Sequence, residues 1–246
     1  MIPEIGPIQT FGVMFALAFL ACGAMAARRF KELGKPADWA YEVVFAALIG
    51  GLIGARAYYL VEHPDEFGFS GVFGGSGLTF WGGAVGGAIG VLIWGRWRGF
   101  LNGHLLDMGG IGLAIGYSIG RIGCQLSGDG DYGVASDLPW AMAYPDGTVP
   151  TTEEVHPTPV YETLAMGLVA WLLWRWRDRF APGVVFAFYL IAAGVERFLV
   201  EFVRRNSDAA IGLTAPQLEA LVALFLGAIV LLVVTRRNDG EILRTS

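Results

Sequence analysis

Charged residues are scarce in this chain of 246 residues, where they make up 16% against 54% for hydrophobic residues. A soluble domain is usually about a quarter charged. The apolar residues lie in long runs, and runs of about 18 or more such residues are typical of membrane-spanning helices. The composition therefore excludes an ordinary soluble domain and indicates an integral membrane protein.

Cysteine and lysine are also rare, with two of each. Cys22 lies within the first apolar run and Cys124 near the far end of the fourth, so their depths argue against a disulfide between them. Cys22 is interpreted as a small core residue. The net charge of −5 says little about partners, because the charges are sorted by side of the membrane, and no nucleic-acid partner is expected.

Seven apolar runs predict an all-α, polytopic membrane protein with a single domain over residues 1–246. The expected spans are about 8–27, 39–61, 78–95, 105–123, 159–175, 182–202 and 216–234. The first run has no positive residue before it and a basic cluster after it. That order is the reverse of a cleaved signal peptide, so we expect this run to remain as an anchor.

Most positive charges follow every second span. These groups are Arg28, Arg29, Lys31 and Lys35; Arg96 and Arg98; Arg175, Arg177 and Arg179; and Arg236, Arg237 and Arg244. Because positive charge collects in cytoplasmic loops, the pattern predicts an amino terminus outside the cell and a carboxyl terminus in the cytoplasm.

The remaining five positive residues, near the outer ends of the predicted spans, are Arg56, Arg121, Arg197, Arg204 and Arg205. Ionisable groups at membrane depth cost about 2.5–3.5 kcal/mol and usually face a protein interior or a wet cavity. In the simplest interpretation these arginine side chains only extend to the lipid headgroups of the outer leaflet, and this suits Arg205 best. A guanidinium, unlike an ammonium, binds phosphate oxygens in pairs, so arginine without lysine predicts a phosphate site in the outer half of the bilayer.

Arg197, Glu201 and Arg204 in "ERFLVEFVRR" are spaced i, i+4, i+7 and share one helical face. Glu201 can pair with either arginine and fix its rotamer. A charge-balanced helix end has the same spacing. This stripe lies inside an apolar run, however, which favours a phosphate clamp held by its own counter-ion.

Glycines recur at spacings of four in "GGLIGAR" (50–56), "WGGAVGGAIG" (81–90) and "GGIGLAIGYSIGR" (109–121). Small residues at this spacing let helix backbones approach closely. We therefore expect most of these glycines to pack helices together. Such packing would also bring Arg56 and Arg121 toward a common interior.

The longest non-apolar segment is a predicted outer loop at about 124–158, and loops of this length are usually functional. In "HPTPVYE" at its end, Pro157 and Pro159 impose an extended conformation. Tyr161 and Glu162 then fall in the first turn of the fifth span, where a carboxylate suits the helix dipole. "GDGDYG" lacks the ligands that complete a calcium loop, so a turn is predicted there and no metal site.

Together these motifs resemble the bacterial prolipoprotein diacylglyceryl transferases over nearly the whole chain. The similar segments, in the family's order, are "IGPIQTFGVMFALAF", "GARAYYL", "LTFWGGAVGG", "GRIGCQLSGDGDYG", "HPTPVYE" and "ERFLVEFVRR". The fourth lies where the family carries the signature G-R-x-G-N-F-x-N-x-E-x-x-G, and the sixth resembles the family's R-F-x-x-E-F-x-R helix. The arginines that match the family are all present: Arg56, Arg121, Arg197 and Arg204.

The chain departs from the family at polar positions. The two asparagines of the signature are Cys124 and Ser127 here, its glutamate is replaced by Asp129, and one extra residue precedes the closing Gly133. Where the family often has His-Gly-Gly, this chain has Trp81 before a glycine pair. Such changes are compatible with a shifted substrate or with lost activity.

The resemblance implies transfer of a diacylglyceryl group from phosphatidylglycerol to the lipobox cysteine of a secreted precursor, in the bacterial inner membrane and toward its outer leaflet. It needs no metal or redox cofactor. Arg121 and Arg197 would stabilise the leaving phosphate, and His156 is on the correct side to act as a base. The residues expected to bind substrate are Arg56, Arg204, Glu201, Tyr161, Glu162, Ser127, Asp129, Gly82 and Gly83.

Three other functions remain open. A non-catalytic lipid-binding relative would keep the arginines without turnover, and a sibling transferase would use another donor or acceptor. A transporter of anions is disfavoured, because the arginines cluster at one depth and no inverted repeat is evident. Cys124 stands where the family has asparagine, so we expect it to pack or hydrogen-bond and not to carry lipid covalently.

Overall fold

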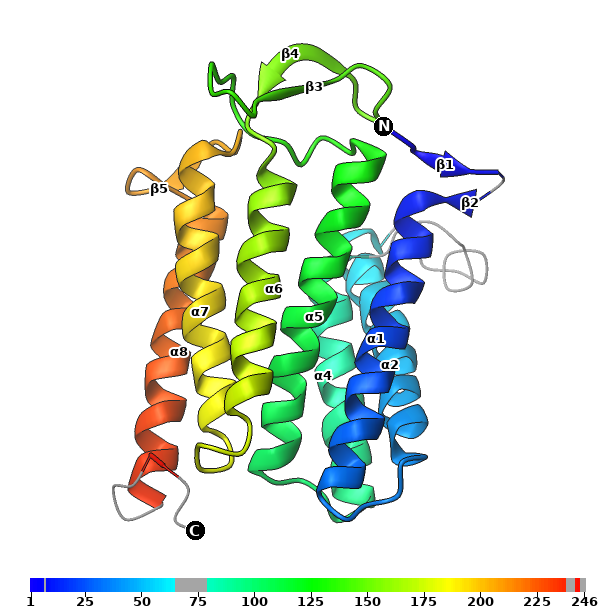
Figure 1. Ribbon diagram of the computed structural model, residues 1–246, viewed down its shortest axis with the longest axis vertical. Helices are drawn as coiled ribbons and strands as arrows, with labels where there is room; N and C mark the ends of the chain where they lie inside the picture. Colours follow the sequence, from blue (N-terminus) through cyan, green and yellow to red (C-terminus); the bar gives the residue numbers. More distant parts are fainter. Residues whose placement is uncertain (7, 65–78, 238–241, 244–246) are drawn as a thin grey trace. The chain divides into compact units, whose positions relative to one another are not determined.

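The computed structural model describes residues 1–6, 8–64, 79–237 and 242–243. Seven α-helices dominate these residues (Figure 1). They are α1 (Thr10–Glu32), α2 (Trp39–Glu62), α4 (Phe80–Trp97), α5 (Gly103–Ser127), α6 (Thr158–Trp176), α7 (Val184–Val200) and α8 (Ala215–Arg237). A 3-10 turn, η2 (Glu201–Val203), follows α7 directly.

Each of the seven predicted spans coincides with one of these helices. By length and composition, three helices among the described residues are apolar enough to cross a membrane: α1, α2 and α8. The prediction of a mostly helical membrane protein is therefore confirmed. The count of seven spans stays a prediction.

Three short antiparallel hairpins accompany the helices of this mostly helical chain. They are β1 (Glu4–Ile5) with β2 (Ile8–Gln9), β3 (Met142–Tyr144) with β4 (Thr151–Val155), and β5 (Asp208–Ala210) with β6 (Leu213–Thr214). The first precedes α1, and the other two lie in segments that connect helices. Their pairing satisfies backbone groups that no helix covers there.

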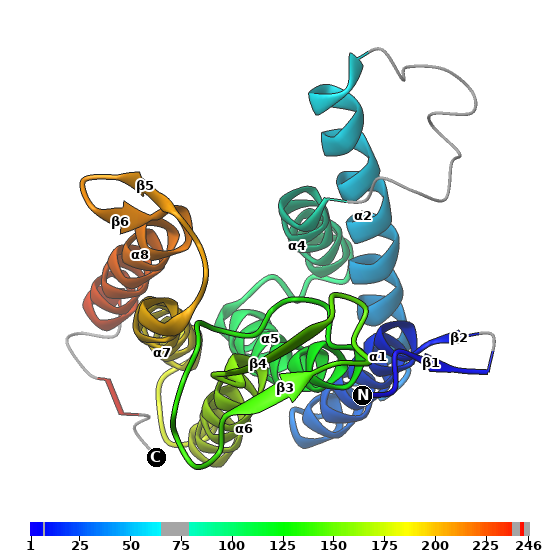
Figure 2. The same cartoon turned by 90° about the horizontal axis from the view of Figure 1, so that it is seen from above.

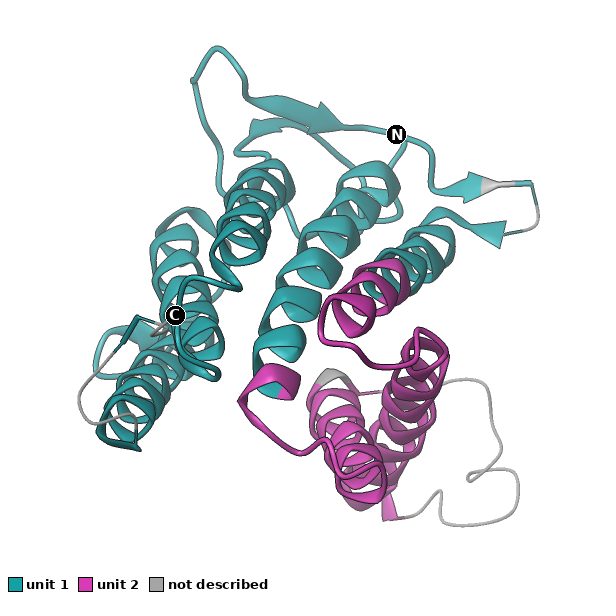
Figure 3. Cartoon of the chain, turned by 60° about the horizontal axis from the view of Figure 1, so that its bottom comes forward, with its two compact units in different colours: residues 1–22, 106–246 teal, residues 23–105 magenta. Residues whose placement is uncertain are grey.

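The chain divides into two compact units (Figure 3). Unit 1 comprises residues 1–22 and 106–246, and unit 2 comprises residues 23–105. The boundaries fall inside α1 and near the start of α5, so both helices contribute to both units.

Unit 1 aligns α5 and α7 in the same direction. The Asp107 carboxylate on α5 accepts hydrogen bonds from the backbone N–H groups of Gly183 and Phe186, each at 2.9 Å. These are the unpaired donors at the start of α7, where a negative charge is favourable. Both helices therefore begin at the same end of unit 1, while α6 and α8 run the opposite way (Figure 1).

In unit 2, α2 and α4 approach through their glycines. A Cβ atom at Gly54 would lie 2.3 Å from the carbonyl oxygen of Gly82, and one at Gly86 would lie 2.2 Å from that of Gly50. Glycine packing is thus confirmed for these two helices. On α5 it holds for Gly110, whose Cβ would lie 3.0 Å from the Tyr189 Cβ.

An aromatic cluster joins the ends of α1 and α4 in unit 2. The ring centroid of Phe30 lies 5.8 Å from that of Trp39 and 5.5 Å from that of Phe100. The cations of Lys35 and Arg98 lie 5.9 and 5.7 Å from the Trp39 ring centroid. Two of the basic groups noted in the sequence therefore meet at one end of this unit.

The predicted loop at 124–158 begins later than expected. Helix α5 continues to Ser127 and ends at Gly128, whose φ of +59° and N–H bond to the Cys124 carbonyl at 2.9 Å close the helix. Glycine takes this left-handed conformation without strain, which is why the helix stops here and not four residues earlier. Cys124 and Ser127 are therefore helical and do not lie in the loop.

The loop that follows folds over the ends of α5 and α6 (Figure 2). Its hairpin β3–β4 pairs further with the preceding segment, since Ser136 N donates to Glu154 O at 3.0 Å and His156 N to Val134 O at 3.0 Å. The stacked rings of Tyr132 and Tyr144, 4.8 Å apart, are buried beneath it.

Candidate functional site

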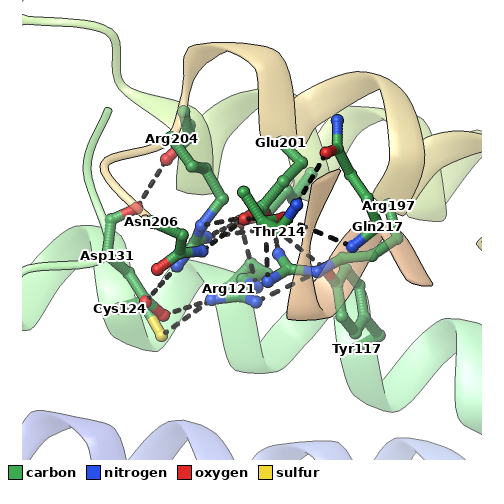
Figure 4. A network of polar contacts seen from close by, with 12 residues as sticks. Tyr117, Arg121, Cys124, Asp131, Arg197, Glu201, Arg204, Asn206, Thr214 and Gln217 are labelled. Atoms are coloured by element: carbon green, nitrogen blue, oxygen red, sulfur yellow. Dashed lines mark hydrogen bonds and ion pairs between the residues drawn. The ribbon is translucent and has the colours of Figure 1, made fainter. Parts of the chain in front are cut away.

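Arginines and carboxylates from four segments meet at the end of unit 1 that the loop covers (Figure 4). The arginine–carboxylate cluster consists of Arg121 on α5, Asp131 in the loop, Glu162 on α6, Arg197 on α7, Glu201 in η2 and the following Arg204. Three positive and three negative side chains thus balance each other.

Glu162 is the common counter-ion of this cluster. Its side chain is fully buried, and its two oxygens lie 3.0 Å from Nε of Arg121, 3.2 Å from Nη1 of Arg197 and 3.3 Å from Nη1 of Arg204. The Tyr117 hydroxyl also donates to it at 2.9 Å. Buried charges persist when paired and hydrogen-bonded. The sequence suggested a helix-dipole role for Glu162, whereas its contacts are with guanidinium groups.

Asp131 links two of the arginines from the loop. Its carboxylate forms ion pairs with Arg121 and, at 2.5 Å, with Nη2 of Arg204. Burial opposes the charged form of Asp131, but the two guanidinium groups outweigh it and hold the pKa of this carboxyl below its ordinary value. The resemblance to the family signature assigns the position of its glutamate to Asp129. The extra residue before Gly133 shifts the register, so Asp131 reaches the arginines.

Glu201 fixes Arg197 and Arg204 from their own face. One carboxylate oxygen lies 3.3 Å from Nη2 of Arg197 and 3.8 Å from Nε of Arg204. The other accepts hydrogen bonds from the Thr214 hydroxyl at 2.9 Å and the Asn206 amide at 2.5 Å. The predicted pairing of Glu201 with both arginines is confirmed.

His156 and Tyr161 meet beside the cluster but outside it. The Tyr161 hydroxyl accepts a hydrogen bond from Trp140 Nε1 at 2.7 Å and lies 3.2 Å from Nδ1 of His156. A Cβ atom at Gly133 would lie 2.9 Å from the His156 Cβ, which places His156 against the loop that carries Asp131. The catalytic and binding roles predicted for these two residues stay predictions.

Two other predicted residues hold the loop in place. The Ser127 carbonyl oxygen accepts the Thr148 N–H at 2.8 Å. Arg205 donates to the Gly133 carbonyl at 2.8 Å and pairs with Glu153 at 3.0 Å. Arg205 therefore contacts protein groups, in contrast to the headgroup contact expected of it, because the loop folds back within its reach.

The remaining predicted site residues belong to unit 2. The Arg56 guanidinium lies 5.1 Å from the ring centroid of Tyr59 on the same helix. Gly82 serves close packing, since a Cβ there would lie 2.4 Å from the Gly54 carbonyl oxygen. Gly83 has more room, with 3.6 Å to the Ala55 Cβ. Their part in a substrate site stays a prediction.

Cys124 and Cys22 are both free thiols. Cys124 lies near Arg121, with Nη1 and Sγ 3.9 Å apart. Potential ligand atoms of Cys124, Asp129 and Asp131 lie within 4.8 Å of one another. The guanidinium groups already paired with Asp131 oppose a cation at this position, so the geometry does not indicate a metal site.

Tyr117 and Asp131 are site residues that the sequence analysis did not identify. Tyr117 precedes Arg121 by one helical turn, and Nη2 of Arg121 donates to its hydroxyl at 3.4 Å. The i, i+4 spacing was a usable signal for Tyr117. For Asp131, the extra residue in the signature was the signal.

The cluster holds its guanidinium groups rigidly while leaving part of two of them open. The side chain of Arg197 is 23% exposed and that of Arg121 is 15% exposed, against 9% for Arg204. A preorganised guanidinium stabilises an anionic oxygen without reorganising during the reaction. Arg197 and Arg121 are therefore the two more exposed guanidinium groups of the cluster.

Comparison with known proteins identifies the family of the chain. The family model of prolipoprotein diacylglyceryl transferase matches residues 1–234. Proteins named phosphatidylglycerol–prolipoprotein diacylglyceryl transferase are 33% identical in Methylococcus capsulatus (96% of this chain, 95% of the relative), 32% in Bordetella avium (97% and 95%) and 30% in Dehalococcoides mccartyi (95% and 92%). Because the family model matches residues 1–234 and these relatives are matched over nearly their full length, the chain belongs to the prolipoprotein diacylglyceryl transferase family.

Proposed function

We propose that this protein transfers a diacylglyceryl group from phosphatidylglycerol to the lipobox cysteine thiol of secreted prolipoproteins. The product is a thioether, and glycerol phosphate is released. The observation that carries the proposal is the set of three guanidinium groups held by Glu162 at one end of unit 1. Family membership supplies the donor and the acceptor named for the relatives.

The reaction needs stabilisation of a leaving phosphate. The acceptor thiol loses its proton, its sulfur attacks the glyceryl carbon that carries the phosphate, and the carbon–oxygen bond breaks. Negative charge then grows on the departing phosphate oxygen. Arg121 and Arg197, fixed by Glu162 and partly exposed, would strengthen their hydrogen bonds as that charge develops.

Topology forms part of the proposal. The amino terminus faces outward, the carboxyl terminus faces the cytoplasm of a bacterial inner membrane, and the cluster lies toward the outer leaflet. In unit 1, α6 and α8 carry basic residues in their last turns, at the end opposite the cluster. Reporter fusions after Arg98 and after Ser246 should both report cytoplasm, and a periplasmic signal from either contradicts this map.

Complementation tests the activity. A strain depleted of its own transferase should regain lipidated precursor when it expresses this chain. Arg121→Lys and Arg197→Lys should each lose most of that product while the protein stays folded in the membrane, because lysine keeps the charge but not the planar fork. Near wild-type lipidation by both variants would contradict the proposal that these arginines form a phosphate clamp.

A second candidate function is a non-catalytic phospholipid-binding relative. It is favoured by Cys124, Ser127 and Trp81, which replace polar family residues. This candidate predicts that the purified protein retains phosphatidylglycerol but gives no lipidated precursor. A sibling transferase with another donor or acceptor would instead be active once its own lipid and peptide are supplied.

A further inference from the structure

Glu196 is a carboxylate beside the arginine–carboxylate cluster that the reaction described above does not use. It lies on α7 immediately before Arg197, outside the R-F-x-x-E-F-x-R pattern of the resemblance, and it is half-buried. Within the described part of the chain, no guanidinium or other donor forms an ion pair or hydrogen bond with it. Such a group at a site that moves protons calls for an explanation.

The register of α5 against α7 places Glu196 opposite Tyr117. The two helices run in parallel from the Asp107 contact, and Gly110 on α5 lies against Tyr189 on α7. One heptad further along both helices are Tyr117 and Glu196, on the same faces as this pair. Glu196 indeed interacts electrostatically with both tyrosines.

Glu196 therefore lies at the edge of the cluster. The charged and titratable groups around it are Tyr117 and Arg121 of α5, Glu162 of α6, Tyr189 and Arg197 of α7, and Arg204. Helix α8, whose acidic residue is Glu219, packs on α7 at Gly194, where a Cβ would lie 2.8 Å from the Ala220 carbonyl oxygen.

The other carboxylates of the cluster are all ion-paired with guanidinium groups. Glu162 accepts from Tyr117 and faces three guanidinium groups, while Asp131 and Glu201 each face two. A general base needs an unoccupied lone pair within reach of the proton it removes. Among the described residues, Glu196 has such an unoccupied lone pair and lies on α7 next to Arg197.

His156 meets the requirement for an unoccupied lone pair less well. Among the described residues, the acceptor within reach of the Tyr161 hydroxyl hydrogen is Nδ1 of His156, at 3.2 Å. This contact engages Nδ1, whichever of the two ring nitrogens carries the proton. Trp81, where the family often has histidine, offers no basic nitrogen.

We propose that Glu196 is the general base of the transfer, an inference that rests on the proposed function. The Glu196 carboxylate takes the proton of the acceptor thiol as sulfur bonds to the glyceryl carbon. The carbon–oxygen bond breaks, and its electron pair leaves with the glycerol phosphate held by Arg121 and Arg197. Glu196 then returns the proton to the leaving phosphate or to water.

The test compares purified wild-type protein, Glu196→Gln and the exposed control Glu154→Gln in liposomes of phosphatidylglycerol with a lipobox peptide. Glu196→Gln should lower kcat/KM by about 10²–10⁴-fold with little change in the KM for lipid, and should abolish the acid limb of the pH profile. Glu154→Gln should match wild type. A selenocysteine peptide, already ionised at neutral pH, should restore the rate of Glu196→Gln to within about tenfold of wild type.

Each outcome is decisive. An unchanged pH profile in Glu196→Gln, or an equal loss with the selenocysteine peptide, would overturn the assignment to Glu196 while leaving the transferase intact. No transfer by wild type would overturn the proposed function and this inference with it. Thermal unfolding in detergent monitors the fold, and Glu196→Asp, which keeps a carboxylate, should retain the acid limb at a reduced rate.

Discussion

The glycine contact in unit 2 and the arginine–carboxylate cluster in unit 1 hold helices together by different means. Unit 2 joins α2 to α4 where side chains are missing, so that a Cβ at Gly54 would collide with the Gly82 carbonyl at 2.3 Å. Unit 1 joins α5, α6, α7 and the outer loop through charges around the buried Glu162. The glycine contact depends on shape alone, whereas the charged contact depends on the partners of every group within it.

The glycine contact is purely structural, whereas the charged cluster can also take part in a reaction. A glycine face is neutral and offers nothing to a substrate beyond space. The arginine–carboxylate cluster costs desolvation energy, which its ion pairs offset. In return it holds partly exposed guanidinium groups where an anionic oxygen can reach them.

Removal of the common counter-ion should have the largest effect. Glu162→Gln leaves three guanidinium groups with two carboxylates, and breaking a buried pair in this way costs about 3–5 kcal/mol. We expect a large fall in the thermal unfolding midpoint in detergent and loss of transfer activity. The exposed Glu154→Gln is the matched control. A Glu162→Gln variant as stable as wild type would show that the cluster does not need this charge.

A larger side chain on the glycine face between α2 and α4 should have the next largest effect, and it should act mainly on stability. Gly54→Ala places a methyl group 2.3 Å from a backbone oxygen, so α2 and α4 must separate at a cost of about 1–3 kcal/mol. Gly51→Ala is the control, because its nearest atom is 3.4 Å away. Equal unfolding midpoints for the two variants would contradict close packing at Gly54.

The next prediction tests which aspartate pairs with the arginines, since the family signature points to Asp129 and the structure shows Asp131 in that place. Asp131→Asn should reduce activity and stability more than Asp129→Asn, because Asp131 pairs with Arg121 and Arg204. The pKa of Asp131 is lowered on folding, so its contribution is complete above the unfolded pKa, about 3.9, and is lost as pH falls through the folded value.

Unfolding midpoints measured against pH should therefore show the Asp131→Asn deficit at pH 6 and its disappearance in strong acid. A larger deficit in Asp129→Asn would restore Asp129 as the partner of the arginines.

Cys124 should give the smallest effect. Cys124→Ser and Cys124→Asn should stay within about tenfold of wild-type activity, a barrier change of about 1.4 kcal/mol, since a packing or weak hydrogen-bonding role suffices at the end of α5. Intact-mass analysis after incubation with phosphatidylglycerol alone should reveal no diacylglyceryl adduct. An adduct that disappears when the acceptor peptide is added would instead establish a two-step reaction through Cys124.

Local patterns in the sequence were sufficient for the membrane class, for helices at all seven predicted spans, for close helix packing through glycines and for the pairing of Glu201 with its neighbours. Each depends on periodicity within one segment or on the size of one side chain. The end of α5 was not predicted correctly, because the left-handed conformation of Gly128 ends the helix. Several glycines occur in this segment, and the sequence does not show which of them takes that conformation.

Only the tertiary structure decided which acids hold the arginines. Glu162 meets Arg197 and Arg204 across 35 and 42 residues of chain, and Asp131 meets Arg204 across 73. A buried guanidinium requires a counter-charge, and the sequence by itself established that requirement. Which of the 22 acidic residues meets it depends on how helices and loop pack, because charge acts through distance in space and not along the chain.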